Sequence, residues 1–155
     1  MMTISLDVEP CLAHYMYARY ANSIQKGAIK LSYRTNLYHI LLELTIPRPK
    51  EVSWKETGNL TLTLPVPNIG KDPRTYNYLS AESVRFFAKE INRQMRREMI
   101  IYLLYEKFEH GIMYKRSLLQ FIAKYDMEEL VNEETLMKHF QLWRKKEKED
   151  RGKRI

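Results

Sequence analysis

The N-terminal half of the chain alternates strand patterns with helical ones. Residues 3–8 carry apolar side chains at every second position, which is typical of a half-buried strand. Leucines alternate with threonines over residues 60–64, the clearest strand pattern in the sequence. A shorter strand is expected at residues 28–32.

Two helices are predicted between these strands. Pro10 suits the first turn of a helix that extends to about residue 21. Thr35 or Asn36 can cap a second helix, which Pro47 and Pro49 terminate. Its apolar positions have helical spacing: Leu37, Ile40, Leu41 and Leu44. The order predicts an α+β domain over residues 1–78, with a small three-stranded sheet and two helices.

The C-terminal half shows only helical patterns. Ser80 can cap a long helix that ends at His110, with Gly111 as the residue after it. Residues 65–78 contain prolines and asparagines, so we place the domain boundary there and expect a helical domain over residues 79–155 without any strand. In an alternative arrangement, the first half of the long helix packs on the sheet and fuses the two parts.

The long helix changes character midway. Its first half has an apolar stripe, and basic residues lie broadly opposite: Arg85, Lys89, Arg93, Arg96 and Arg97. After Ile100 the helix is apolar nearly all round, so we expect this half to be buried on several sides by the last two helices.

The last two helices form the most informative segment. The first of them covers about residues 115–125, and Asn132 can cap the second. In the second helix, Leu136, Phe140 and Trp143 share one face. Lys138, Gln141, Lys145 and Lys148 share the opposite face, and a basic tail runs from Arg144 to Arg154. We therefore expect Trp143 to be buried and these four polar residues to be exposed.

This helix pair resembles a helix-turn-helix. Such a module places its second helix in the major groove, where Lys or Arg can read guanine and Gln can read adenine. Five acidic residues sit where the recognition helix would approach DNA and would repel phosphate: Asp126, Glu128, Glu129, Glu133 and Glu134. The alternative is a helical hairpin with a solvated charged face.

The net charge of +7 favours an anionic partner. The principal hypothesis is a non-enzymatic protein that binds nucleic acid, DNA rather than RNA, as a regulator or accessory factor. Its expected contacts are Arg85, Lys89, Arg93, Lys138, Gln141, Arg144, Lys145 and Lys148. The alternative is a structural or protein-interaction module that assembles through the long helix, which could form a homo-oligomer.

No familiar catalytic motif is present. Cys11 is the only cysteine, the four histidines lack metal-ligand spacing, and neither a P-loop nor GxGxxG occurs. We therefore expect no catalytic residue, cofactor or metal, although folding could bring a DNA-processing site together. Tyr15, Tyr17, Tyr20 and Tyr33 could stack on unpaired bases, or could be half-buried.

No membrane association is expected. The longest apolar run, residues 99–105, falls far short of the roughly 20 residues that span a bilayer. The N-terminus also lacks the basic and apolar regions of a secretory signal, so a cytoplasmic location is expected.

Two stretches carry a family resemblance, DPRTYNYLS at residues 72–80 and LLQFIAKY…LMKHFQLWRKK near the end. Through them the chain resembles small uncharacterised proteins carried by bacterial phages and mobile elements. The resemblance implies no activity and assigns no site residue.

Overall fold

The alternation of leucine and threonine forms the central strand of a mixed sheet. The computed structural model describes residues 2–53, 57–66 and 70–153. In it, β5 (Leu60–Thr63) pairs antiparallel with β1 (Thr3–Leu6) and parallel with β3 (Ala28–Ile29). Leu60 and Leu62 are fully buried, while the threonines of β5 are half-buried. The alternation therefore gives one apolar face of the sheet, as expected.

The sheet has one more strand than predicted. β2 (Ile24–Gln25) pairs with β3, giving the order β1-β5-β3-β2, so the expectation of three strands is wrong. Lys26 and Gly27 connect these strands, both with positive φ, as in a type I′ hairpin turn. A separate two-stranded ladder joins β4 (Ile46–Pro47) to β6 (Tyr76–Tyr78). Strands of two or three residues are too short to show an alternating pattern.

The helices of this part begin and end close to the expected residues. α1 (Pro10–Arg19) has Pro10 in its first turn, and a short 3-10 helix, η1 (Ala21–Ser23), follows it. α2 (Asn36–Leu44) is capped by the Thr35 hydroxyl, which accepts a hydrogen bond from the Tyr38 amide at 3.3 Å. The fully buried side chains of α1 and α2, including Tyr15, Met16 and Leu41, belong to the core beside the sheet.

α3 (Ala81–His110) has the predicted start and end. The Ser80 hydroxyl accepts a hydrogen bond from the Ser83 amide at 3.2 Å. At the other end Gly111 has φ +66, and its N–H donates to the Lys107 carbonyl at 3.0 Å. This left-handed residue ends the helix in the way glycine favours.

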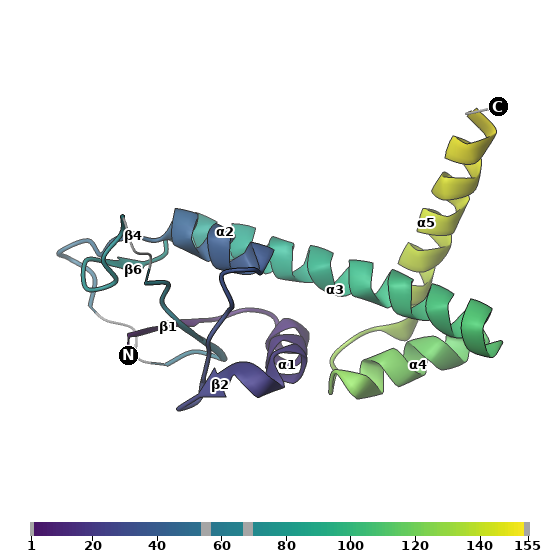
Figure 1. The fold of residues 1–155 in the computed structure, drawn as a ribbon, viewed down its shortest axis with the longest axis horizontal. Coiled ribbons are helices and arrows are strands. Elements are labelled where there is room, and N and C mark those ends of the chain that lie inside the picture. Colours follow the sequence, from purple (N-terminus) through teal and green to yellow (C-terminus); the bar gives the residue numbers. More distant parts are fainter. Residues whose placement is uncertain (1, 54–56, 67–69, 154–155) are drawn as a thin grey trace. The chain divides into compact units, whose positions relative to one another are not determined.

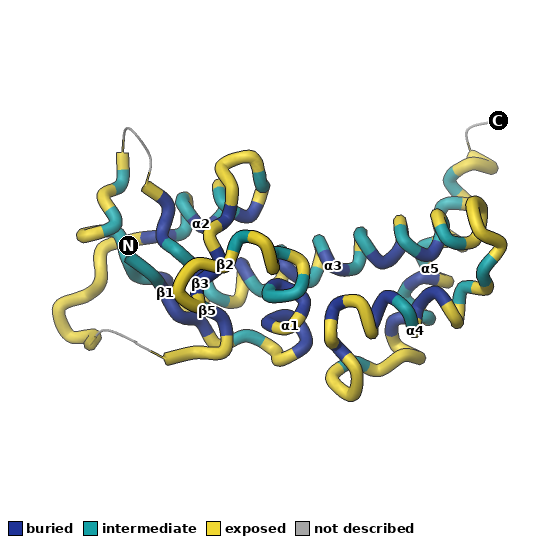
Figure 2. Tube along the Cα trace, turned by 60° about the horizontal axis from the view of Figure 1, so that its bottom comes forward, coloured by how far each residue is buried: buried dark blue, intermediate teal, exposed yellow. Residues whose placement is uncertain are grey.

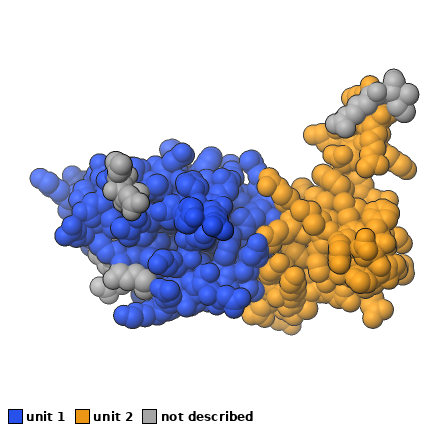
Figure 3. Space-filling view, viewed as in Figure 1, with its two compact units in different colours: residues 1–95 blue, residues 96–155 orange. Residues whose placement is uncertain are grey.

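The chain divides inside α3 rather than at residues 65–78, where we placed the boundary. The compact units are Met1–Met95 and Arg96–Ile155, termed here the first and second units (Figure 3). Phe87 and Ile91 are fully buried, and Gln94 Nε2 donates to the hydroxyls of Tyr15 and Tyr20, both at 3.0 Å. These contacts make the first half of α3 part of the first unit, as in the alternative arrangement above.

The second unit contains the rest of α3 with α4 (Tyr114–Lys124) and α5 (Glu133–Lys153), and no strand occurs in residues 79–153. Asn132 caps α5 by accepting a hydrogen bond from the Thr135 amide at 3.0 Å. The tail residues Arg154 and Ile155 lie outside the described part of the chain. The core of this unit is formed by all three helices, with Met99, Leu103, Phe121, Leu136 and Phe140 at most 4% exposed.

The second half of α3 is buried on one side only. Ile101 is 59% exposed, Tyr105 is 55% exposed and Phe108 is 77% exposed. These residues lie at i, i+4 and i+7, so they form one stripe along the helix. Figure 2 shows exposed and buried positions alternating along α3. The expectation of burial on several sides is wrong because α4 and α5 cover only the face that carries Met99 and Leu103.

Candidate nucleic-acid interface

α5 separates a core face from a cationic face. Leu136 and Phe140 are buried at 4% and 0% exposure. The four polar residues predicted for the other face are all exposed: Lys138, Gln141, Lys145 and Lys148. The helical period therefore predicted this face correctly.

Trp143 departs from the prediction. It is half-buried rather than buried, with its ring stacked on Phe140 at 6.2 Å between centroids and an interplanar angle of 19°. Figure 1 shows the C-terminal turns of α5 extending beyond α4. Trp143 lies where the packed part of α5 ends, so one side of its indole contacts the core and the rest stays accessible.

A groove of about 470 Å³ runs along this part of the second unit. Its apolar lining comes from three helices: Leu104 and Phe108 from α3, Tyr114 from α4, and Trp143 from α5. The polar lining comes from α5 alone and consists of Gln141, Arg144, Lys145, Glu147, Lys148 and Arg151. The groove thus combines aromatic surface with four cations and one carboxylate.

The ring of Tyr114 contacts two cationic side chains. The Arg144 guanidinium lies 4.8 Å from the centroid of the Tyr114 ring, and Lys107 Nζ lies 5.7 Å from it. Both distances fall within the range of a cation–π interaction. Arg144 Nη1 also donates to Gln141 Oε1 at 3.1 Å. Arg144 is exposed, and its guanidinium is oriented by Tyr114 and Gln141.

The other cations of α5 are not neutralised within the described chain. Among residues 2–53, 57–66 and 70–153, no ion pair engages the side chains of Lys138, Lys145, Lys148 or Arg151. Their positive charge is thus available to an anionic partner.

The cations expected on the long helix form a separate set in the first unit. Arg85, Lys89 and Arg93 are exposed on the first half of α3. Arg93 Nη1 lies 3.4 Å from Glu90 Oε1, so one of the three charges is partly neutralised. Of the eight predicted contact residues, the structure gathers Gln141, Arg144, Lys145 and Lys148 in one groove.

The acidic run precedes α5 and occupies its first turn. Its five members are all exposed: Asp126, Glu128, Glu129, Glu133 and Glu134. Asp126 and Glu129 have φ of 55° and 65°, so these two residues bend the connection between α4 and α5. The acidic run therefore lies at the start of α5, and the groove cations lie in its second half together with Glu147, Glu149 and Asp150.

The tyrosines proposed for base stacking serve the fold of the first unit. Tyr15 is fully buried, and the Tyr17 hydroxyl accepts a hydrogen bond from the Thr61 amide at 3.0 Å. Tyr20 receives its bond from Gln94, as described above. Tyr17 and Tyr20 are half-buried, and Tyr33 is 64% exposed.

Burial shifts the pKa of Cys11 and of His139. Burial, followed by the charge of Glu9, raises the pKa of the Cys11 thiol. Burial, followed by the charge of Arg96, lowers the pKa of His139. Among the described residues, no group of three or more His, Cys, Asp or Glu side chains is placed to hold a metal ion.

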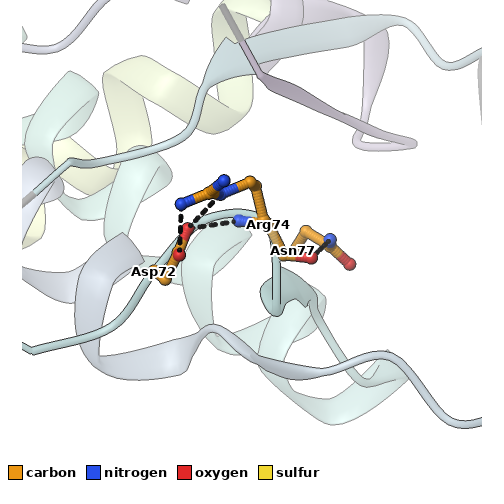
Figure 4. A network of polar contacts seen from close by, with 3 residues as sticks. All are labelled: Asp72, Arg74 and Asn77. Carbon is orange, nitrogen blue, oxygen red and sulfur yellow. Dashed lines mark hydrogen bonds and ion pairs between the residues drawn. The ribbon is translucent and has the colours of Figure 1, made fainter.

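The resemblance segment at residues 72–80 is a structural turn. Figure 4 shows the Arg74 guanidinium folded onto Asp72, with Nη2 3.2 Å from Oδ2. Hydrogen bonds from the amide and side chain of Arg74 lower the pKa of Asp72. Asn77 Nδ2 donates to the Arg74 carbonyl at 3.1 Å. The turn leads into β6 and the Ser80 cap, so this segment positions the start of α3.

Six groove residues were not among the predicted contacts: Leu104, Phe108, Tyr114, Trp143, Glu147 and Arg151. Arg151 follows Arg144 and Lys148 at i+7 and i+3, so the helical period of α5 could have revealed it. Phe108 and Tyr114 carried no such signal, because their place in the groove depends on how α3, α4 and α5 pack.

Comparisons with protein-family models, with curated proteins and with solved structures give no match to this chain. Within the described residues, none of the helices is both long enough and apolar enough to cross a membrane.

Proposed function

We propose that this chain is a non-enzymatic nucleic-acid-binding protein, with DNA as the preferred ligand, and that α5 carries the main contacts. The observation behind the proposal is the groove that gathers Arg144, Lys145, Lys148 and Arg151 beside Gln141. Unneutralised cations on one surface supply sequence-independent affinity for phosphates. The resemblance to phage and mobile-element proteins is the reason for proposing a regulator or accessory factor.

The binding mode we propose departs from a compact helix-turn-helix. Eight residues, 125–132, separate α4 from α5, whereas the compact motif has a turn of roughly three to four. In that motif the N-terminal residues of the second helix approach the bases. Here that end carries Glu133 and Glu134, which would repel phosphates. We therefore assign the contacts to the C-terminal half of α5.

A salt titration tests the proposal. Duplex DNA is titrated with wild-type protein, with Lys145→Ala/Lys148→Ala, and with a control in which the exposed first-unit residues Lys30 and Lys50 are changed to Ala. Each lost phosphate contact should lower the slope of log K against log salt by about 0.9. The groove variant should therefore lose up to two such steps, and the control should match wild type. Absence of salt-dependent binding of wild-type protein to both duplex and single-stranded DNA would refute the proposal.

The exposed stripe on α3 favours a second candidate function, assembly. Ile101, Tyr105 and Phe108 form a continuous apolar surface on one helix, and such surfaces commonly mark interaction sites. Arg97 lies six residues before Leu103 and Glu109 lies six residues after it. Two copies of α3 could pair antiparallel along the stripe, with the symmetry axis at the level of residue 103. Arg97 of one copy would then lie opposite the partner's Glu109, so the charges around the stripe are self-complementary.

Assembly can be tested without touching the groove. Ile101 and Tyr105 do not line it, so Ile101→Glu/Tyr105→Glu changes the stripe alone. If the chain assembles through this surface, light scattering after gel filtration should give a dimer for wild type and a monomer for the variant. A wild-type monomer at all concentrations tested would remove this candidate.

A further inference from the structure

The groove of the second unit has the chemistry of a site for an unpaired nucleotide. Its volume of about 470 Å³ falls within the roughly 300–1,000 Å³ usual for small-ligand sites. Two of its lining side chains, Phe108 and Trp143, are aromatic rings that are not fully covered: Phe108 is 77% exposed and Trp143 is half-buried. A flat aromatic partner can therefore reach them.

The third aromatic ring plays a different part. Tyr114 is engaged by Arg144 and Lys107 through cation–π contacts, and its ring centroid lies 4.8 Å from that of Phe140. Its ring is therefore occupied within the protein. What Tyr114 does for the groove is to hold the Arg144 guanidinium beside the exposed aromatic surface.

Cations line the groove together with these rings. Three of the cations lie at helical spacing along α5: Arg144, Lys148 and Arg151. Lys145 adds a positive charge on the exposed side of the same helix. Glu147 is the only carboxylate among the lining residues. A ligand that matches this surface has a backbone with repeated negative charges, and flat apolar groups attached to that backbone.

We propose that the groove binds single-stranded nucleic acid, with a base stacked on Phe108 or Trp143 and the adjacent phosphates contacting Arg144, Lys148 and Arg151. Combined stacking and phosphate contact is how proteins bind single strands without reading sequence. In a duplex the base faces are covered by their neighbours, so a paired strand cannot use the aromatic rings. This inference rests on the proposed function and specifies the ligand class of the same site.

The test separates stacking from phosphate binding. The probes are a fluorescein-labelled dT oligomer of about ten nucleotides, within the usual range of site sizes, and an abasic oligomer of the same length. Both carry the same phosphates, but only dT has bases. Wild-type protein should bind dT about five- to 150-fold more tightly than the abasic oligomer, the range expected for one stacked base.

Two variants locate the stacking surface. Phe108→Ala should lose most of the preference for dT and leave abasic binding unchanged, because an exposed phenyl ring is not needed for folding. Ile101→Ala is the matched control, since Ile101 is exposed on the same helix and does not line the groove. In a Trp54→Phe background, Trp143 is the only tryptophan, and dT should quench its emission.

Three other outcomes would overturn the stacking inference. If dT and the abasic oligomer bind equally and Lys145→Ala/Lys148→Ala weakens both, the stacking inference is overturned and the proposed function stands. If no single strand and no duplex binds, both are overturned. If polyglutamate binds as tightly as dT and Phe108→Ala weakens it equally, the groove accepts an acidic protein instead, which also overturns the inference.

Discussion

At the scale of single residues, Cys11 is a buried thiol beside a carboxylate in the first unit. Cys11 is 8% exposed, and its sulfur lies 3.9 Å from Glu9 Oε2. Burial and then the neighbouring carboxylate raise the pKa of the thiol, so less of the reactive thiolate forms near neutral pH. Cys11 thus behaves as a small apolar core residue.

We predict slow modification of Cys11 in the native protein. A thiol reagent such as DTNB should react at least tenfold more slowly with folded protein than with protein in denaturant, because burial limits both access and ionisation. Glu9→Gln should speed native labelling modestly, since it removes the charge but not the burial. Labelling of wild-type protein at the denatured rate would contradict this account.

The surroundings of His139 predict that the stability of the second unit depends on pH. Burial and then Arg96 lower its pKa below the usual value of 6.5. The unfolded chain therefore binds a proton more readily than the folded chain as pH falls through 6.5. Stability should be unaffected by His139 above this pH and should decline below it, levelling off only beneath the folded-state pKa.

Urea denaturation between pH 5 and pH 8 would measure this effect. His139→Gln should show a shallower decline below pH 6.5 than wild type, because glutamine does not titrate. His110→Gln is the matched control, as His110 is exposed in the same unit. Identical pH profiles for wild type and His139→Gln would refute the assignment.

At the scale of elements, the end of α2 depends on one distant side chain. Lys71 Nζ donates to the carbonyls of Leu42, Glu43 and Thr45 at 2.8, 2.9 and 2.8 Å. The last carbonyls of a helix lack N–H partners within it, and a cation at this end also matches the helix dipole. The Leu42 carbonyl accepts a second hydrogen bond, from the Thr45 hydroxyl at 2.9 Å. The ammonium therefore replaces the missing hydrogen bonds of the last turn.

We predict that Lys71→Met destabilises the first unit by about 1–3 kcal/mol, as expected for loss of charge-assisted hydrogen bonds. Methionine keeps much of the aliphatic length, so the packing change is small. Lys30→Met, at an exposed position, should change the free energy of unfolding by less than about 0.5 kcal/mol. Equal effects of the two substitutions in chemical denaturation would show that the capping bonds contribute nothing.

Local patterns predicted the longer elements well. The caps at Thr35, Ser80 and Asn132, and Gly111 after α3, act within a few residues of the positions that reveal them. The β3–β5 and β4–β6 pairings and the Lys71 cap are different, because they join segments far apart in the sequence. The β2–β3 hairpin is local, but its two-residue strands are too short to show an alternating pattern. β4 pairs with β6 across some thirty residues, and no local period records that pairing.

The candidate site also has a part that local patterns predict and a part that depends on long-range packing. The exposed face of α5 could be predicted because it depends only on helical period. The groove could not, because Phe108 and Tyr114 reach it through the packing of α3 and α4 against α5. The burial of Trp143 was overestimated for a related reason, since its helical position does not show where the packed part of α5 ends.

At the scale of the whole molecule, one helix is shared by two cores. Phe87 and Ile91 are fully buried in the first unit, while Met99 and Leu103 are fully buried in the second. Each half of α3 is thus stabilised by its own set of neighbours. A substitution in one core should therefore act first on the helices and strands of that unit.

Phe140 provides the test. It is fully buried, and its ring partners Tyr114 and Trp143 both lie in the second unit. Phe140→Ala should destabilise that unit by about 3–5 kcal/mol, the usual range for an aromatic core residue. Trp143→Ala removes a half-buried ring that lines the groove, so its effect should be smaller, about 1–2 kcal/mol.

Native-state hydrogen exchange would show where each variant acts. In Phe140→Ala, amide exchange should accelerate in α4, in the first turns of α5 and in the part of α3 that carries Met99 and Leu103. Amides of β5 should keep wild-type rates, because Leu60 and Leu62 are buried in the core of the first unit. Equal acceleration in β5 would mean that the two cores open together, so that α3 joins them into a single cooperative unit.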